Sequence, residues 1–374
     1  MHEGARGWAR VVAVVLLLAG APLPGSGQDS QPSGKGPFAT FFAVHMEAGT
    51  HGGQGGEYQE RQWPNLVRFV TMADGYHAKL TLMFNPQWAE YILKDEEKVK
   101  RVREWQKAGH EVAIHYHNTW HGDWNGYTNR KDERFTRDPR YRGAVPEMMG
   151  LLEKLAAPDK MLSMCMGPKP GWDSVEEVEI DEPDYPEGVV YDVDGMDRGL
   201  SRLLRTKFRE QDLYHLKHHF FAPNPGRREH LERIQEEFGR AGPDEVLGVV
   251  THEADFGSSP EFIEKWFQFC REKGAEIRTV RDVVRSYPED RIVDVEWVPQ
   301  RGGVERRARP AGGALLEKVR TFQESLGRVK GKGLDTSEAE ALDTASREAA
   351  RGGNLEAAER LIDKAITALG RLER

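Results

Sequence analysis

Short apolar runs alternate with longer amphipathic segments along most of this 374-residue chain, and this order constrains the fold more than any other feature. The apolar runs are predicted to be buried strands, at residues 37–46, 79–84, 111–116, 160–166, 213–221 and 246–251. Helices are predicted between them, at residues 64–73, 87–108, 145–156, 227–238 and 260–273, and surface loops at 167–200. Apolar strands that alternate with helices indicate a parallel sheet covered on its faces. We therefore expect an α/β fold, a (β/α) barrel that is incomplete or distorted.

The first 27 residues have the pattern of a secretory signal peptide. Arg6 and Arg10 precede an apolar stretch at 11–23, which is too short to span a bilayer, and small residues follow it. Cleavage after Gly27 would leave a flexible leader at 28–36. We expect an exported chain, secreted or periplasmic, without a membrane span.

The rest of the chain divides into a barrel domain at 37–298, a linker at 299–313 and a helical module at 314–374. The linker is rich in Gly, Pro and Arg, and apolar residues recur at helical spacing beyond it. We expect a small helical hairpin or bundle there, which either packs on the barrel or mediates association with another protein or a second copy.

Charge and cysteine content exclude some functions. The formal net charge is −8, whereas nucleic-acid binding favours a basic surface. Cys165 and Cys270 are the two cysteines, and in an oxidising compartment they either form one disulfide or stay buried as thiols. The sequence does not indicate a metal site with cysteine ligands.

Histidines and carboxylates gather where three of the predicted strands end. These residues are His45 and Glu47 after the first strand, His115, His117 and His121 around the end of the third, and His252, Glu253 and Asp255 after the sixth. Functional groups of parallel α/β folds collect beyond the carboxyl ends of the strands. The three clusters are therefore predicted to line one pocket, although each histidine alone could be an ordinary hydrogen-bonded loop residue.

The spacing within these clusters is suited to a metal ion. Residues i and i+2 of a strand point to the same side, so Glu47 shares a face with His45, and His115 shares one with His117. Two histidines and a carboxylate can hold Zn²⁺ and leave one position open for water. We expect a divalent metal cofactor, Zn²⁺ in the first place, with Co²⁺, Ni²⁺ or Mn²⁺ as alternatives.

The segment GHEVAIH, which places a Gly-His-Glu four residues before His115, resembles the second motif of polysaccharide deacetylases, the NodB-homology carbohydrate esterases. The late VVTH strand and the helix after it are similar to the end of that domain. The resemblance covers about residues 37–287. It implies metal-dependent removal of acetyl groups from an N- or O-acetylated glycan, with His252 as the general acid.

The sequence also departs from the family pattern. Two acidic residues of the first motif are replaced by His45 and Glu47, so Glu47 is expected as a metal ligand and His45 as either base or ligand. His115 is expected as a ligand, and either His117 or His121 as the second metal histidine, because Thr119 occupies the usual place. Asp255 and the loop aromatics Trp120 and Trp124 are candidate substrate contacts.

Two other functions remain open from the sequence. One is a glycoside hydrolase on a related barrel, which would use Glu47 with Asp255 or Glu253 as a carboxylate pair. The other is a non-catalytic glycan-binding or scaffold protein that retains the fold. The segment Lys217–His219 could also line the pocket, or could lie on a strand or surface loop instead.

Overall fold

The structure is a computed structural model, and it describes residues 36–49, 56–121, 123–166, 178–195, 198–222 and 228–299, with most of 318–372. The predicted signal peptide, nearly all of the leader and nearly all of the linker lie outside these residues. Among the described residues, no helix combines the length and apolarity needed to cross a bilayer.

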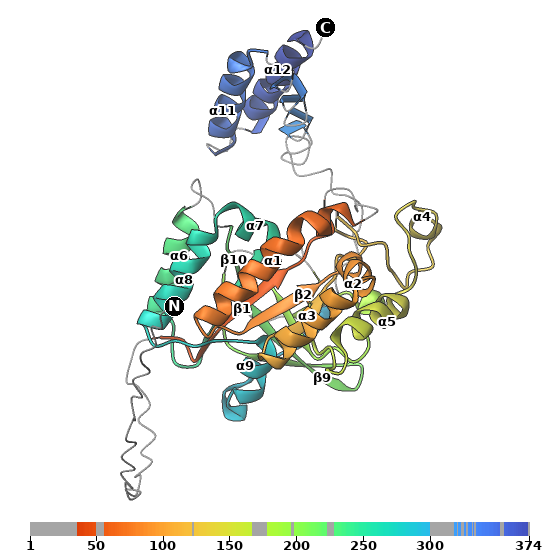
Figure 1. The fold of residues 1–374 in the computed structure, drawn as a ribbon, viewed down its shortest axis with the longest axis vertical. Helices are drawn as coiled ribbons and strands as arrows, with labels where there is room; N and C mark the ends of the chain where they lie inside the picture. Colours follow the sequence, from red (N-terminus) through yellow and green to blue (C-terminus); the bar gives the residue numbers. More distant parts are fainter. Residues whose placement is uncertain are drawn as a thin grey trace, which may run out of the picture. The chain divides into compact units, whose positions relative to one another are not determined.

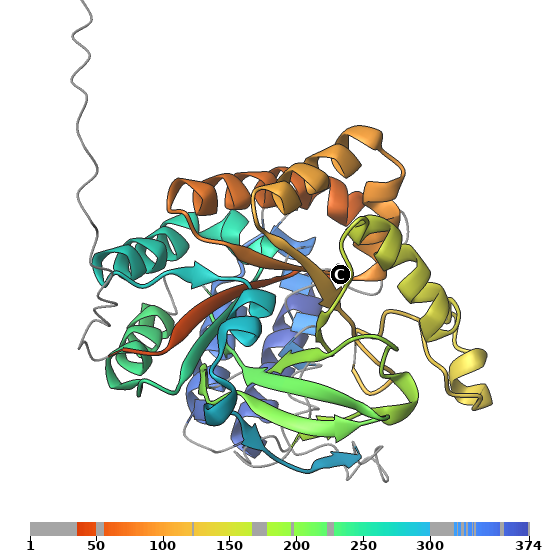
Figure 2. The same cartoon turned by 90° about the horizontal axis from the view of Figure 1, so that it is seen from below.

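A curled sheet surrounded by helices forms the barrel domain (Figures 1 and 2). Its strands are β1 (Ala39–His45), β2 (Leu80–Phe84), β3 (Glu111–His115), β4 (Ser163–Cys165), β6 (Tyr191–Asp194), β7 (Leu200–Ser201), β8 (Leu204–Phe208), β9 (Gln211–Lys217), β10 (His219–Phe220), β11 (Val246–His252), β12 (Ile277–Arg278) and β13 (Val293–Asp294). The strand order is β10-β11-β1-β2-β3-β4-β6-β9-β8-β13, and the pairs from β10 to β9 are parallel. The expected incomplete (β/α) barrel is therefore confirmed.

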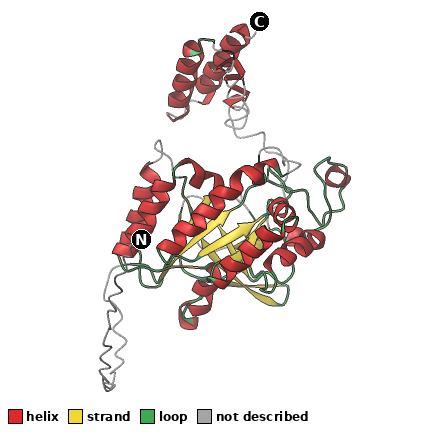
Figure 3. Cartoon of the chain, in the orientation of Figure 1, coloured by secondary structure: helices red, strands yellow, loops and turns green. Residues whose placement is uncertain are grey.

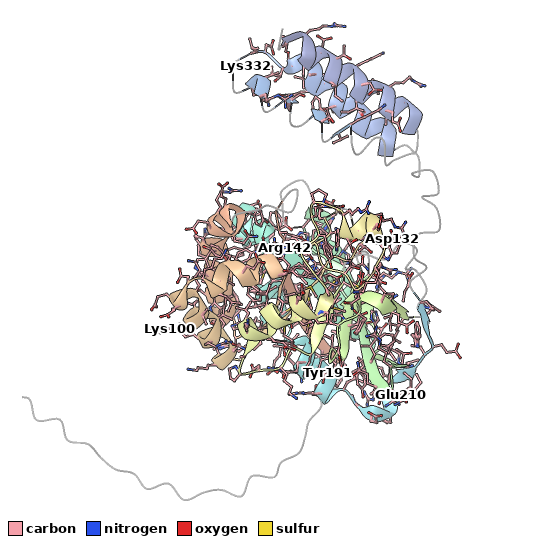
Figure 4. The ribbon with its side chains drawn as sticks, turned by 90° about the vertical axis from the view of Figure 1, so that its right-hand side faces the viewer. Lys100, Asp132, Arg142, Tyr191, Glu210 and Lys332 are labelled. Atoms are coloured by element: carbon pink, nitrogen blue, oxygen red, sulfur yellow. The ribbon has the colours of Figure 1, made fainter. Side chains whose placement is uncertain are left out.

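Helices cover the outside of the sheet, as the red and yellow elements of Figure 3 show. They are α1 (Glu57–Gly75), α2 (Pro86–Leu93), α3 (Glu96–Lys107), α4 (Glu133–Thr136), α5 (Val145–Ala156), α6 (Arg228–Arg240), α7 (Glu253–Ser258), α8 (Pro260–Glu272) and α9 (Val280–Ser286). A separate two-stranded sheet pairs β5 (Val178–Ile180) with β14 (Trp297–Pro299). Charged side chains such as Lys100 and Glu210 lie at the surface of the domain (Figure 4).

Three predictions need correction. The predicted helix at 87–108 is two helices, because the Asp95 side chain accepts hydrogen bonds from Glu97 N and Lys98 N and so starts α3 afresh. The region predicted as loops, residues 167–200, contains strands β5 and β6. Strand β8 and helix α7 lie outside this region and were not predicted. The predicted strand at 213–221 is β9 followed by β10, with His218 between them.

The two faces of β1 pack into two different cores. Phe42 and Val44 belong to the core between the sheet and the outer helices. Phe41 and Ala43 point the other way, into a core inside the barrel that also contains Val283 of α9. Both cores are largely apolar, with a few buried polar contacts such as the Asp192–His215 pair, and the histidines and carboxylates of the cavity follow at the carboxyl ends of the strands.

The helices α11 (Ser337–Arg351) and α12 (Leu355–Leu372) have a small apolar core of their own, which includes Ile362 and Leu369. The bounds of the predicted helical module stay a prediction. Its association with a partner or a second copy stays a prediction.

Gly248 of β11 allows the end of β9 to lie against this strand. A Cβ atom at this position would lie 2.2 Å from the backbone oxygen of Lys217 and 2.3 Å from the Phe41 ring. No side chain fits at such distances, so the placement of His218 depends on this glycine.

We expect Gly248→Ala to lower the free energy of unfolding by about 3 kcal/mol, since a backbone atom must move to accommodate the methyl group. Gly150→Ala is the matched control, because nothing lies within 4 Å of its added Cβ on helix α5 and the stability should hold or rise. Thermal unfolding followed by calorimetry measures both variants. Equal melting temperatures for the two variants would contradict this account of the β9–β11 contact.

Candidate metal centre

A cavity of about 200 Å³ opens at the carboxyl ends of the barrel strands. The ends of β1, β3, β4, β6 and β11, together with the β9–β10 junction, all contribute to its wall. The lining residues are His45, Glu47, His115, His117, His121, Asp123, Cys165, Asp194, Gly195, His218, Phe220, Val250 and His252. The parallel register explains this gathering, since His45 pairs with His252 and His115 pairs with Cys165.

The carboxylate of Glu47 lies at the centre of three imidazole rings. Its Oε1 atom is 3.1 Å from His115 Nε2, 3.2 Å from His252 Nε2 and 3.9 Å from His117 Nε2.

The backbone of Glu47 is held on both sides. Its N–H donates to Glu253 Oε2 at 3.2 Å, and its carbonyl accepts from Trp88 Nε1 at 2.8 Å. The side chain is therefore positioned by contacts that do not occupy its carboxylate.

Burial and charge set the protonation states around Glu47. Burial alone would raise the pKa of Glu47, but His115, His252 and His117 outweigh it and hold the pKa well below its usual range. Burial, with the neighbouring His115, also holds the pKa of His117 well below that of a free imidazole. At neutral pH the site therefore offers an anionic carboxylate beside a neutral imidazole, which are the forms that bind a metal.

The donor atoms of Glu47, His115 and His117 all lie within 4.8 Å of one another, a spacing that suits one ion. The orientation of His117 fits this use. Its Nδ1 lies 3.2 Å from the carbonyl of Asp123, and a proton on Nδ1 leaves the Nε2 lone pair facing Glu47. A lone pair directed at a carboxylate is unfavourable unless a cation lies between them, so the residues present fit a divalent metal.

His121 lies beside this donor set. Its ring stacks on His117 with centroids 3.7 Å apart, and its Nδ1 accepts a hydrogen bond from Asp123 N at 3.1 Å. Of the two candidates for the second metal histidine, His117 is the one that the structure groups with Glu47 and His115.

His252 lies between two carboxylates. Its Nε2 faces Glu47, and its Nδ1 is 3.2 Å from Asp255 Oδ2. Burial alone would lower the pKa of His252, but the contacts with Asp255 and Glu47 raise it to about 10. The ring therefore carries a proton at neutral pH, as a general acid must.

His45 is buried and neutral. Its ring stacks on His115 with centroids 4.0 Å apart, and its buried Nε2 has no hydrogen-bond partner among the described residues. Burial, assisted by the neighbouring His115, His218 and His252, holds the pKa of His45 well below that of a free imidazole.

The two tryptophans expected to contact substrate do not line the cavity. Trp124 is 2% exposed, and its indole donates to the carbonyl of Tyr127 at 2.8 Å, so it offers no open face for a sugar ring. Arg130 covers Trp120 at 4.8 Å from the ring centroid. The aromatic residue on the cavity wall is Phe220, whose ring centroid lies 4.8 Å from that of His252.

Residues outside the predicted clusters complete the cavity, and no sequence pattern singled them out as a group. Cys165 ends β4 inside an apolar run, and Asp194 ends a strand that was predicted as loop. Of the segment Lys217–His219, His218 faces the cavity, whereas His219 Nδ1 pairs with Glu237 at 3.0 Å. Both cysteines are buried thiols and form no disulfide with each other.

The His110–Glu111 pair of the GHE segment lies away from the cavity, at the amino end of β3. His110 Nδ1 accepts from Leu80 N at 3.0 Å, and Glu111 accepts from Thr81 and from Arg281 N at 3.1 and 3.0 Å. These contacts tie β3 to β2 and α9, so this part of the motif has a structural role.

Comparisons with known proteins add little to this description. No family profile matches the sequence, and a search of curated proteins found no significant match. Among solved structures, the chain is similar to a candidate polysaccharide deacetylase from Mycobacterium smegmatis, with 13% identity, a TM-score of 0.45, and coverage of 73% of this chain and 96% of that one. It is also similar to a 4-alpha-glucanotransferase from Thermococcus litoralis, with 13% identity, a TM-score of 0.45, and coverage of 79% and 46%. For a GH57-type branching enzyme from Pyrococcus horikoshii, the identity is 11%, the TM-score 0.43 and the coverage 90% of both chains.

We expect the metal-free protein to lose stability as the pH falls below about 6.5, in part through His218. Burial lowers the pKa of His218 to about 3 in the folded chain, against about 6.5 for a free imidazole. Between these two values the unfolded chain binds a proton that the folded chain does not, so unfolding is favoured by about 1.4 kcal/mol per pH unit.

His218→Gln removes this titration. Its free energy of unfolding, measured by urea denaturation between about pH 6 and pH 4, should fall less steeply than that of the wild type. Parallel curves for the two proteins would show that His218 is not buried as a neutral ring.

Proposed function

We propose that this chain is a metal-dependent hydrolase that removes acetyl groups from an N- or O-acetylated glycan. The observation that carries the proposal is the position of Glu47 Oε1, at 3.1 to 3.9 Å from three imidazole nitrogens on the wall of a cavity. The GHE segment and the late VVTH strand support the same family of reactions by resemblance.

The ligands in this proposal are Glu47, His115 and His117, and the ion is Zn²⁺, with Co²⁺, Ni²⁺ or Mn²⁺ as alternatives. When bound, such an ion activates water for attack at neutral pH and polarises a carbonyl oxygen. The protein residues supply the remaining functions.

His252 is the proton donor of the proposal. Two carboxylates hold its ring in the charged form, and the ring borders the cavity where a leaving amine or alcohol would depart. Asp255 positions His252 through Nδ1. His45 is the proton acceptor, because its ring is neutral and lies against that of His115.

The size of the cavity favours an acetyl group over a whole sugar. Pockets that enclose drug-sized ligands measure about 300–1,000 Å³, whereas this cavity measures about 200 Å³. An acetyl group fits inside it while the sugar ring stays at the rim, near Phe220. Export through the predicted signal peptide would bring the protein to extracellular or periplasmic glycans.

A glycoside hydrolase is the second candidate, because Glu47 and Asp255 flank His252 on opposite sides. That reaction needs two carboxylates that are available to the sugar. Here three imidazoles surround Glu47, and one of them also engages Asp255, which favours the metal-dependent reaction.

We expect the purified protein to carry close to one equivalent of a divalent metal per Glu47 site, measured by elemental mass spectrometry. Glu47→Gln, His115→Ala and His117→Ala should each lose most of this metal and the release of acetate from acetylated oligosaccharides, because each removes one of three ligands. His77→Asn is the control, since His77 is exposed and has a positive φ that asparagine tolerates. Full acetate release from metal-free protein would refute the proposal, and glycosidic cleavage without metal would favour the second candidate.

His252→Gln should separate proton transfer from metal binding. We expect this variant to keep its metal and to lose about 10²-fold or more in kcat for acetate release, because general acid catalysis contributes on that order. Steady-state kinetics and metal content measured on the same preparation test this. A variant with unchanged kcat would exclude His252 as the proton donor.

A further inference from the structure

Three side chains outside the Glu47 set converge on the same cavity. His45 comes from the end of β1, Cys165 from the end of β4 and His218 from the junction of β9 and β10. Their donor atoms, one from each side chain, lie within 4.8 Å of one another. These residues are far apart in the sequence, and the curled sheet brings them together.

The imidazoles of this cluster lack the hydrogen bonds that buried polar groups normally make. His45 is 6% exposed and His218 is 1% exposed. Nε2 of His45 and both ring nitrogens of His218 have no hydrogen-bond partner among the described residues. An unsatisfied buried donor or acceptor costs about 1–3 kcal/mol, so several at one place indicate that the place is built for a ligand.

The chemistry of the three donors points to a metal ion. Two neutral imidazoles and a thiol are the ligands that Zn²⁺ and other thiophilic ions prefer, and none of them is suited to Mg²⁺ or Ca²⁺. A tetrahedral zinc site needs donor atoms about 3.3–3.6 Å apart, so the observed spacing requires adjustments of only about 1 Å.

We propose that His45, Cys165 and His218 form a second metal site that binds a thiophilic transition-metal ion such as Zn²⁺. Binding forms one metal–sulfur bond and releases the thiol proton of Cys165 to solvent, while the two histidines bind as neutral rings. Asp194 lines the same cavity, and its carboxylate is the candidate for a fourth position.

The second site borders the Glu47 site through the stacked rings of His45 and His115. One lone pair cannot serve a metal and a proton at the same time. If the proposed function holds, an ion at the second site therefore occupies the proton acceptor His45, and excess metal inhibits acetate release. This consequence rests on the proposed function, whereas the site itself does not.

Cobalt binding to the full-length, metal-free protein tests the proposal, because cobalt bound to a thiolate gives an intense charge-transfer band in the near ultraviolet. We expect the wild type to bind two equivalents of Co²⁺ and to show this band. Cys165→Ser should lose the band and one equivalent, and His218→Gln should weaken binding of the same equivalent by about tenfold or more. Cys270→Ser is the matched control, since Cys270 is buried in helix α8, and it should keep both equivalents and the band.

Glu47→Gln distinguishes the two sites. This variant should keep the charge-transfer band of the Cys165 site and lose the equivalent of Co²⁺ bound at the Glu47 site. If the Glu47 site does not bind metal at all, the wild type will therefore show the band with a single equivalent of Co²⁺. A wild type without the band, or a Cys165→Ser protein that retains it, would overturn the second site whether or not the first site binds metal.

Discussion

The parallel pairing of β1 with β2 on one side and β11 on the other is the constraint on which the site depends. All seven residues of β1 are buried, and its alternate side chains enter two separate apolar cores. A shift of one residue would exchange the two faces and place apolar side chains in the cavity. The register instead sets His45 beside His252 and carries Glu47 just beyond the strand, among three imidazoles from the ends of β3 and β11.

The cavity joins two donor sets of different character. Glu47, His115 and His117 combine an anionic oxygen with nitrogen donors, whereas His45, Cys165 and His218 combine nitrogen with sulfur. Burial keeps His45, His117 and His218 neutral, whereas His252 is held in the charged form. His252 differs from these three histidines because its two ring nitrogens face two carboxylates, those of Glu47 and Asp255.

Much of the barrel could be predicted from the sequence because its central strands are continuous apolar runs. Helix α5 has the predicted bounds, and the runs that became β1, β2, β3 and β11 were located to within a few residues. The strand β8 was missed because its residues LRTKF alternate between buried and partly or fully exposed positions, a pattern weaker than a continuous apolar run. The break between α2 and α3 depends on a single side-chain cap at Asp95, which an unbroken helical pattern conceals.

Site residues could be predicted where their spacing along one strand determines their positions. They could not be predicted where contacts between distant segments of the chain determine them. The spacing of His115 and His117 placed both on one side of a strand end, but only the structure groups His117 rather than His121 with Glu47. The sequence around Cys165 and His218 has the pattern of buried strands and does not indicate a site. These two residues meet His45 only because the curled sheet brings the strand ends together. Trp124 is close to the predicted ligands in the sequence. In the structure it is buried, and its indole donates a hydrogen bond to the carbonyl of Tyr127 in the same loop.

Anomalous X-ray diffraction from crystals of the zinc-loaded protein, recorded at the zinc edge, would locate the metal relative to Glu47. We predict a peak in the cavity within about 2.2 Å of a Glu47 oxygen and of one nitrogen each of His115 and His117. A cavity without a peak, or zinc bound only at surface carboxylates, would contradict it.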